Sequence, residues 1–461
     1  MTDTATVFPT KQFFVGMLTR DIELSDAIFD LLDNCVDGLL RTVTHLKSKN
    51  PYQGFWASIN FKEGKFTISD NCGGIPIERA EKDAFAMGNP KHENHLPTLG
   101  MYGIGMKRAI FKLGRSARVI SQTSEAAFEV NLSKYWPDND KDWNLLLTPI
   151  NKPFEQAGTL IEVDELHEAV TREAFEIQEL FLDELRRLIA SHYTNFIAKG
   201  FKIMVAGKPI ERKPLTLLFN PRLKKPSQKI MPYIYKGEIN GVKVKLIVGL
   251  LGPTPTDDEL EEELDLPRNR GEEAGWTIIC NDRVVVYGDK TPLSGWGEEN
   301  VPCYHSQFSA ISGVVEFESL DSMKLPLTTT KGLNPSSDIY RLVKSMMREG
   351  TRIFTNFTNK WKAYREEEPA LYKKLQKTEI GKIISKIPES DFILVRGHQW
   401  EKKSLPDLPK PNPENPKRQV KFAAMQLEIR RLAEFLFEDK ETPESEVGIE
   451  CFNRVLREIK Q

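Results

Sequence analysis

Residues 24–40 read LSDAIFDLLDNCVDGLL, and this stretch decides the fold. Apolar side chains recur along it at the spacing of an amphipathic helix. On such a helix Asp30, Asn34 and Asp37 line up along one flank. Solvent-facing flanks usually carry Lys and Glu, whereas this flank carries two short carboxylates and an amide with no cation between them. The cluster favours a site that positions Mg²⁺ and a water, and a chance cluster on a wet face is the alternative.

The composition of the chain limits its class. The chain has 461 residues, too many for one ordinary core, so two or three domains are expected. Its formal net charge of -2 gives no argument for a nucleic-acid partner. Five widely spaced cysteines without a C-x-x-C pair indicate neither a disulfide framework nor a zinc site, and they favour a reducing cytoplasm. Because neither a signal peptide nor a long apolar run is present, a cytoplasmic protein without a membrane partner is expected.

A β-hairpin is predicted after the helix. Residues 55–61 and 65–69 alternate between apolar and polar side chains, with Glu-Gly between them. The second strand runs directly into Asp70-Asn-Cys-Gly-Gly-Ile-Pro76. Two adjacent glycines let a backbone approach a flat ligand closely, and Asp70 could accept a hydrogen bond from an exocyclic amine such as that of adenine. An ordinary Asp-Asn turn is the alternative interpretation.

A glycine-rich stretch opens a second predicted helix. Residues 99–114 read LGMYGIGMKRAIFKLG, with three glycines ahead of the apolar pattern. Free backbone N–H groups at a helix start form an anion site suited to a polyphosphate, and Lys107 and Arg108 add positive charge there. The stretch matches neither the P-loop nor the dinucleotide-binding motif. Residues 78–98 are polar and poorly periodic, which predicts a mobile loop or lid.

Four signals in a fixed order carry a family resemblance. They are the acid-x-x-x-Asn-x-x-Asp helix, the strand ending in Asp-Asn-x-Gly-Gly, the lid with its glycine-rich helix start, and Gly158-Thr159 opening a strand. In this order the chain resembles the GHKL ATPase superfamily, which includes the DNA gyrase B subunit, MutL, histidine kinases, the large heat-shock chaperone and MORC proteins. The sequences of these motifs are most similar to those of MORC-like and chaperone-like bacterial members. The resemblance covers residues 24–163 and implies a Bergerat-type α/β sandwich that binds ATP and Mg²⁺.

The resemblance also implies roles for individual residues. Asn34 matches the metal-binding asparagine, Asp70 the adenine-binding aspartate, and Thr159 the threonine that supports it. Asp30 stands where the family has the glutamate that activates water, and its shorter side chain predicts slow hydrolysis. Cys72 departs from the glycine that many members have at its position. The expected nucleotide-binding residues are Asn34, Asp37, Asp70, Gly74, Ile75, Met87, Gly100, Tyr102, Gly103, Ile104, Gly105, Met106, Lys107 and Thr159.

The rest of the chain predicts a second α+β domain and a helical end. In the gyrase, MutL and MORC branches a transducer domain follows the ATPase domain, and one of its lysines reaches the γ-phosphate. Lys331 occupies the matching place, and a surface lysine in a Thr-rich turn is the alternative. The expected domains are a GHKL ATP-binding domain at 1–205, a transducer-like α+β domain at 206–335, a helical extension at 336–400, a Pro-rich basic linker at 401–421 and a C-terminal helical segment at 422–461.

The resemblance implies Mg²⁺-dependent attack of water on the γ-phosphate, with Asp30 as base and Lys331 as sensor. It further implies ATP-gated domain closure, a homodimer in the ATP-bound state, and an action on DNA or an effector protein, with bacterial antiviral defence as one setting. Two other hypotheses stay open. One is a nucleotide-gated adaptor with negligible hydrolysis, and the other is a chaperone-like ATPase that acts on protein clients.

Overall fold

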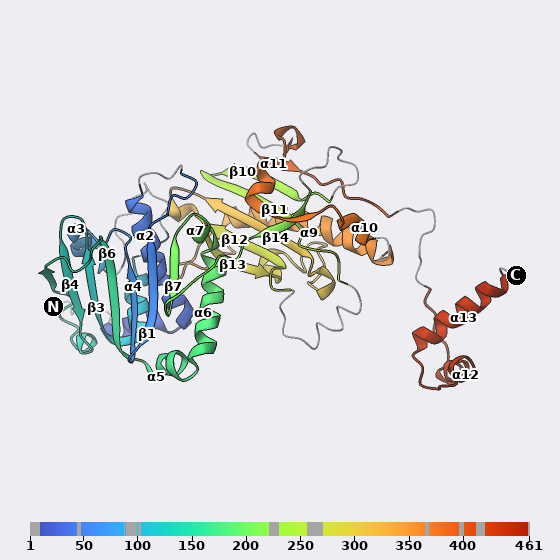
Figure 1. Cartoon of the computed structure of the whole chain (residues 1–461), viewed down its shortest axis with the longest axis horizontal. Coiled ribbons are helices and arrows are strands. Elements are labelled where there is room, and N and C mark those ends of the chain that lie inside the picture. The colour runs from blue at the N-terminus through green and yellow to red at the C-terminus, as the bar shows by residue number, and fades with distance from the viewer. Residues whose placement is uncertain are drawn as a thin grey trace, which may run out of the picture. The chain divides into compact units, whose positions relative to one another are not determined.

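The structure is a computed structural model, and contacts divide the chain into two units, residues 1–411 and 412–461 (Figure 1). Met87, Gly100 and Tyr102 lie outside the described residues, as does most of the expected lid. The described residues are 10–43, 48–86, 88, 99, 103–220, 230–255, 271–364, 368–395, 401–411 and 420–459.

An eight-stranded sheet organises the N-terminal part of the first unit. Its strands are β1 (Trp56–Lys62), β2 (Lys65–Asp70), β3 (Gly114–Gln122), β4 (Ala127–Leu132), β5 (Leu147–Ile150), β6 (Gly158–Leu166), β7 (Lys202–Val205) and β8 (Lys208–Pro209). The order across the sheet is β5-β4-β3-β6-β2-β1-β7-β8, and only β1 and β7 pair in parallel. Buried and half-buried residues alternate along β1, so one face of the sheet meets the core.

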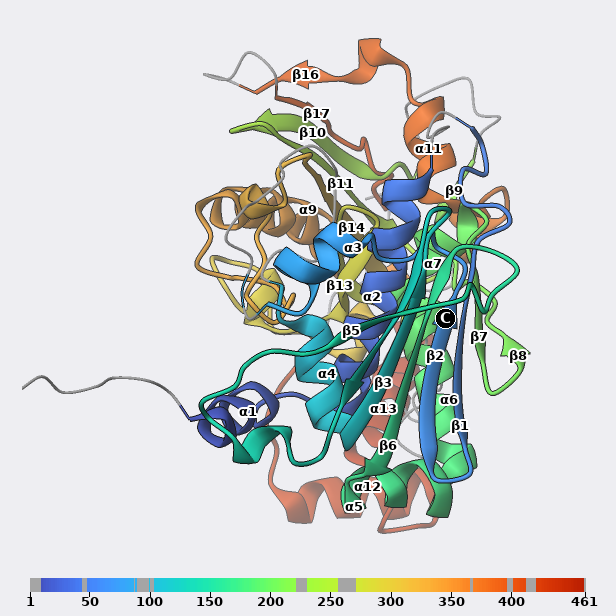
Figure 2. The same cartoon turned by 90° about the vertical axis from the view of Figure 1, so that its left-hand side faces the viewer.

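Helices cover that face of the sheet (Figure 2). They are α1 (Lys11–Thr19), α2 (Leu24–Thr42), α4 (Gly105–Leu113), α5 (Glu168–Thr171), α6 (Gln178–His192) and α7 (Thr194–Ala198). The short helix α3 (Ile77–Arg79) has no buried residue and does not belong to this layer. α2 is buried on nearly all sides: Asp30 and Asp37 on its polar flank are only 2% and 7% exposed. The interpretation of this flank as a chance cluster on a wet face is therefore wrong.

A second, seven-stranded sheet forms the other half of the first unit. Its order is β13-β12-β14-β11-β10-β17-β16, and only β12 and β14 pair in parallel. Its strands are β10 (Tyr233–Ile239), β11 (Val242–Leu250), β12 (Gly275–Cys280), β13 (Arg283–Asp289), β14 (Ile311–Glu318), β16 (Ile393–Leu394) and β17 (Lys402–Ser404). The long helix α9 (Asp338–Trp361) packs its buried side chains into the core on one face of this sheet. The opposite face packs against α11 (Ile380–Lys386) and β9 (Thr216–Phe219), and β9 pairs with β15 (Gln376–Glu379).

The hairpin predicted after the first helix is confirmed by its turn, since Glu63 and Gly64 have positive φ between β1 and β2. The pair Asn281-Asp282 predicts a second hairpin around residues 276–287, and it too is confirmed, since both residues have positive φ between β12 and β13. These residues take the left-handed conformation that a two-residue hairpin turn requires.

Four other expectations are wrong. The apolar spacing of residues 171–199 predicts one long helix, but the segment is divided into α5, α6, α7 and an intervening π-helical turn. Residues 208–228 are rich in Pro and Lys and predict a linker, but they contain β9, and β17 lies inside the linker expected at 401–421. Both strands find pairing partners far away in the sequence. α9 is no separate extension, because it completes the core of the second sheet.

Short helical turns connect the larger elements. They are α10 (Pro369–Tyr372), the π-helical turns Ala80–Ala84 and Arg172–Glu176, and the 3₁₀ turns Trp136–Asp138, Pro292–Ser294, Ser306–Phe308, Ser322–Lys324, Lys362–Tyr364 and Glu389–Asp391.

The second unit is a pair of helices, α12 (Gln426–Phe437) and α13 (Glu444–Ile459), which contact each other. Each helix leaves large apolar side chains exposed within this unit, and these include Leu427, Phe435, Ile449, Phe452 and Val455. Two short helices bury little core by themselves. Nowhere in the described part of the chain is a helix both long and apolar enough to cross a membrane.

We expect Gly350→Ala to destabilise the protein. Gly350 lies inside α9, and a Cβ there would overlap the Cγ1 of Val248 on β11. The usual gain of about 1 kcal/mol for Gly→Ala in a helix is then outweighed by overpacking, which costs about 1–3 kcal/mol. Denaturant unfolding measures the change. Gly16→Ala in α1, where a Cβ meets nothing within 4 Å, is the matched control and should be neutral or stabilising. Equal effects of both substitutions would contradict this packing of α9.

Candidate functional site

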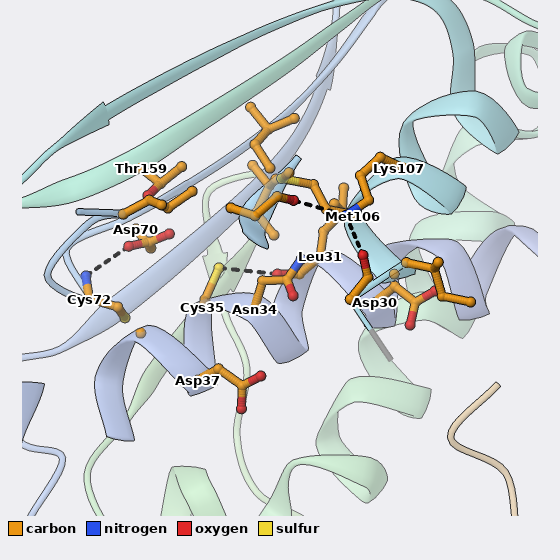
Figure 3. Close-up of a pocket in the computed structure, with 18 of the residues that line it drawn as sticks. Asp30, Leu31, Asn34, Cys35, Asp37, Asp70, Cys72, Met106, Lys107 and Thr159 are labelled. Atoms are coloured by element: carbon orange, nitrogen blue, oxygen red, sulfur yellow. Dashed lines mark hydrogen bonds between the residues drawn. The ribbon is translucent and has the colours of Figure 1, made fainter. Parts of the chain in front are cut away.

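One pocket in the first unit collects most of the residues that the sequence singles out (Figure 3). It lies between the polar flank of α2, the end of β2, the start of α4 and Thr159 on β6. The expected residues that line it are Asp30, Asn34, Asp37, Asp70, Gly74, Ile75, Gly103, Ile104, Gly105, Met106, Lys107, Thr159 and Lys331. Of the expected set, only Met87, Gly100 and Tyr102 are missing, and these lie outside the described residues.

Asp70 forms one end of the pocket, beside Thr159 (Figure 3). Its Oδ1 accepts a hydrogen bond of 2.7 Å from the backbone N–H of Cys72, and Thr159 is its partner in the pairing of β2 with β6. Burial raises the pKa of the Asp70 carboxyl to about 6, although neighbouring N–H groups partly oppose that rise. A half-buried carboxylate that lines a pocket in this way can accept a hydrogen bond from a donor on a flat ring.

The glycines beside Asp70 are required by the protein's own packing. Gly74 has a φ of +70°, and a Cβ on it would overlap the carbonyl oxygen of Gln122. Gly158 on β6 would likewise overlap the carbonyl oxygen of Asp70. The sequence-based interpretation gave the Asp-Asn-x-Gly-Gly glycines to a flat ligand. Gly74 does line the pocket, and it also lets the strand ends approach closely beside Asp70.

Asn34 projects from α2 toward the middle of the pocket (Figure 3). Its Nδ2 is buried and has no hydrogen-bond partner among the described residues. Buried amides are normally hydrogen-bonded, so an unsatisfied one that lines a pocket indicates a place for a polar ligand.

The start of α4 supplies a second polar surface. Within the described residues no side chain caps this helix at Ile104, so the N–H groups of its first residues, Gly105, Met106 and Lys107, are placed to bind an anion. Arg41 and Arg79 also line the pocket, and the sequence did not single them out.

Lys107 differs from its expected role. Its ammonium donates to the carbonyl of Ala84 at 2.9 Å and to the carbonyl of Gly103. Burial lowers its pKa to about 8. The lysine therefore ties the π-helical turn Ala80–Ala84 to the start of α4, and its ammonium is already engaged by carbonyls at the place where a phosphate contact was expected.

Asp30 is paired on both sides, contrary to the expectation of an unpaired acid. The Nε of Arg108, from α4, donates to its Oδ2 at 2.8 Å, and the Nζ of Lys331 lies 3.3 Å from its Oδ1. Arg108 was expected, with Lys107, to add positive charge for a polyphosphate. In the structure it pairs with Asp30, and that contact across 78 residues could not be read from the sequence.

A second acid of α2, Asp33, was missed. It is 1% exposed and holds three partners from distant parts of the chain: Lys331, Arg283 and Tyr193. Burial alone would raise the pKa of Asp33, but Arg283 and Lys331 outweigh it and lower the pKa to about 2. Burial alone would lower the pKa of Lys331, but Asp33, Asp30 and Asp37 keep it above its ordinary value. Both groups are charged at neutral pH.

Comparison with known proteins agrees with this geometry. Residues 22–168 match the family described as histidine kinase-, DNA gyrase B- and HSP90-like ATPases. A search of curated proteins finds no match. The matched segment contains α2, β2, α4 and β6, which are the elements that build the pocket. The fold is thus α+β with an N-terminal GHKL ATPase domain, a second α+β part and a helical C-terminal region, and the family supports ATP binding.

We expect Asp70→Asn to change how stability depends on pH. The raised pKa means that the folded protein binds a proton more tightly than the unfolded chain, so this carboxyl favours folding at low pH. Its contribution is complete below pH 4 and is lost as the pH rises through about 6, by up to about 3 kcal/mol. Asp70→Asn should remove that part of the slope. Urea unfolding at pH 4, 5, 6 and 7 measures the free energy of unfolding of both proteins. An identical pH dependence of the two would show that folding does not raise the pKa of Asp70.

Proposed function

We propose that the N-terminal domain binds Mg²⁺-ATP, that it hydrolyses ATP slowly, and that the second domain responds to the bound nucleotide. The observation that carries this proposal is the meeting of Asn34, Asp70 and the uncapped start of α4 in one pocket. These groups come from separate parts of the chain, and together they offer an acceptor for a base, an amide for a metal and N–H donors for phosphates.

Asn34 fits Mg²⁺ as a single protein ligand. Its amide has an unsatisfied Nδ2, and an amide that turns about its last bond can present its oxygen instead. Across the described ranges there is no group of three or more His, Cys, Asp or Glu that could hold a metal ion unaided. That fits Mg²⁺, which is usually held by one or two protein groups together with substrate phosphates. When bound, the ion would neutralise charge on the β- and γ-phosphates.

The other residues of the pocket would divide the work of hydrolysis. Asp70 would accept a hydrogen bond from the amine of adenine, and the first N–H groups of α4 would hold the phosphate oxygens. Asp30 would accept the proton of the attacking water while the oxygen of that water bonds to the γ-phosphorus and ADP leaves. Lys331, from the second domain, would balance the charge of the γ-phosphate, which gives residues 206–335 a transducer role.

A nucleotide-gated adaptor with negligible hydrolysis is a second candidate, and one observation favours it. The Oδ2 of Asp30 receives two donors from Arg108, and its Oδ1 faces Lys331. A carboxylate that is occupied in this way is a weaker proton acceptor until at least one cation moves. Binding without appreciable turnover would then be the output, and the second domain would pass the nucleotide state to an effector.

The target belongs to the proposal as well. By analogy with MutL-like and MORC-like relatives, ATP would favour a closed homodimer that acts on DNA or on an effector protein, with antiviral defence as one setting. This part is supported by the match of residues 22–168 to GHKL-type ATPases and by the ion pairs of Lys331 with Asp30 and Asp33.

We expect three substitutions to separate binding from hydrolysis. Asp70→Asn should weaken ATP binding by about 10-fold or more, because its amide NH₂ would face backbone donors. Asn34→Ala should weaken ATP binding only when Mg²⁺ is present. Asp30→Ala should retain binding and lower phosphate release by about 10- to 100-fold. Calorimetry and a phosphate-release assay measure these effects.

Asp183→Asn is the control for that series, because its carboxylate forms an exposed ion pair on α6 and should leave binding and turnover unchanged. Failure of the wild-type protein to bind ATP with Mg²⁺ would overturn the proposal. Equal phosphate release from wild type and Asp30→Ala, with ATP still bound, would establish the adaptor instead.

We expect ATP to change the oligomeric state. A non-hydrolysable ATP analogue with Mg²⁺ should shift the protein toward a dimer in gel filtration with light scattering, whereas ADP should not. The reason is that only a triphosphate presents a γ-phosphate to Lys331. Lys331→Met should abolish the shift while ADP still binds. A dimer that forms equally with ADP, or without nucleotide, would argue against gating.

A further inference from the structure

Arg283 connects the second domain to the nucleotide helix. It is the first residue of β13, and its Nε donates to the Oδ1 of Asp33 on α2 at 3.0 Å. Its guanidinium carbon lies 5.0 Å from the ring centre of Phe29 and 4.7 Å from that of Tyr193. Its NH1 donates to the carbonyl of Val284. An arginine enclosed by two rings and bonded at both ends of its guanidinium is fixed in one position.

Asp33 therefore divides its two oxygens between a fixed group and a movable one. Oδ1 is held by Arg283 and by the hydroxyl of Tyr193, which donates at 2.7 Å. Oδ2 accepts from the Nζ of Lys331 at 3.0 Å. The lysine has a long flexible side chain, and its second acid partner, Asp30, is slightly farther away at 3.3 Å.

Lys331 is presented by a strained turn. Its φ is +61°, which costs a residue with a side chain about 1–2 kcal/mol. The turn is closed by hydrogen bonds from Lys331 N to Thr328 O at 3.0 Å and from Thr328 N to Gly332 O at 2.8 Å. Strain of this kind persists where surrounding contacts hold it, and the ion pairs of Lys331 are such contacts.

The ion network reaches the pocket through Lys331. Lys331 and Asp30 line the pocket, whereas Asp33, Arg283 and Tyr193 are not among its lining residues. A phosphate in the pocket would contact Lys331 directly. It would not contact Asp33, but it would compete with Asp33 for the ammonium of Lys331.

We propose that Asp33 and Arg283 are positioning residues for the ATP reaction: Arg283 fixes Asp33, and Asp33 holds the ammonium of Lys331 beside Asp30 until a γ-phosphate takes it. This inference rests on the proposed function. It assigns the resting position of the sensor lysine to a carboxylate that lies one residue before the metal ligand Asn34. Binding of a triphosphate then has to displace one ion pair, and a diphosphate leaves that pair in place.

Two features follow from this arrangement. Removal of the Asp33 charge should loosen the turn around Lys331 in the absence of nucleotide. It should also favour triphosphate over diphosphate, because the lysine no longer has to leave a carboxylate. A purely structural ion pair between the domains would instead lower stability and weaken both nucleotides alike.

The first test needs no nucleotide. Amide hydrogen exchange of the segment 325–335 is compared between wild type, Asp33→Asn and the control Asp183→Asn. We expect exchange to be about 5-fold faster or more in Asp33→Asn only. Because Asp33→Asn leaves Arg283 without its carboxylate, the double variant Asp33→Asn/Arg283→Gln removes both charges and should show the same faster exchange.

The second test is the ratio of affinities for a non-hydrolysable ATP analogue and ADP, both with Mg²⁺. The ratio should rise about 5-fold or more in Asp33→Asn and in the double variant, and remain near the wild-type value in Arg283→Lys, which preserves the charge next to Asp33. Thermal melting confirms that each variant is folded.

An unchanged ratio together with unchanged exchange in folded variants would overturn the inference. Failure of the wild type to bind either nucleotide would overturn the proposed function instead, and the exchange measurement would still decide whether Asp33 holds the turn of Lys331. If both single-site variants at Asp33 and Arg283 are unfolded, the pair is structural and the inference fails.

Discussion

The structure depends on the burial of three carboxylates along one helix. Asp30, Asp33 and Asp37 of α2 are each less than a tenth exposed. A buried carboxylate is stable only with hydrogen bonds or cations around it, and one left alone costs several kcal/mol. The partners therefore have to come from elsewhere: Arg108 from α4 and the backbone N–H of Leu99 from the N-terminal half of the first unit, and Arg283 and Lys331 from its other half. The two halves of the first unit are thereby joined at the residues that line or flank the pocket.

Local sequence signals predicted the parts of the site that depend on short-range geometry. Apolar spacing placed Asp30, Asn34 and Asp37 on one flank of α2, and the glycine-rich stretch correctly predicted the start of α4. Two-residue turns fixed the hairpins because few residues accept a positive φ. Long-range pairing escaped prediction: β9 and β17 pair with strands far along the chain, and their flanking Pro and Lys residues are typical of linkers.

The same limit applies to the charges of the site. Asp33 and Arg283 are 250 residues apart, so no local pattern could join them. One signal was nevertheless present. Asp33 directly follows Leu31 and Leu32 in a largely apolar helix, and an acid that is buried there has to find a cation or lose its charge. The Lys107 contact was missed for a related reason, since a lysine beside a glycine-rich helix start can bind backbone carbonyls as readily as phosphate. Composition identifies the available charges, and only tertiary packing decides which ones pair.

The ion network also bears on why binding and turnover need not go together. In the proposed function, Asp70, Asn34 and the first N–H groups of α4 would receive the nucleotide, and all three lie in the N-terminal part of the first unit. Asp30 differs, since its carboxylate is paired with Arg108 from α4 and also faces Lys331 from the part that follows the first sheet. Nucleotide affinity would then depend on the N-terminal part, whereas the proposed proton acceptor would depend on where Lys331 is held. The short side chain of Asp30 strengthens this difference between binding and turnover. Its carboxylate lies so close to α4 that a Cβ on Gly105 would be 3.2 Å from Oδ1. Asp30 therefore has little freedom to turn away from Arg108. Under the proposed function, the chain would therefore detect a triphosphate first and would cleave it only when the cations around Asp30 have been redistributed.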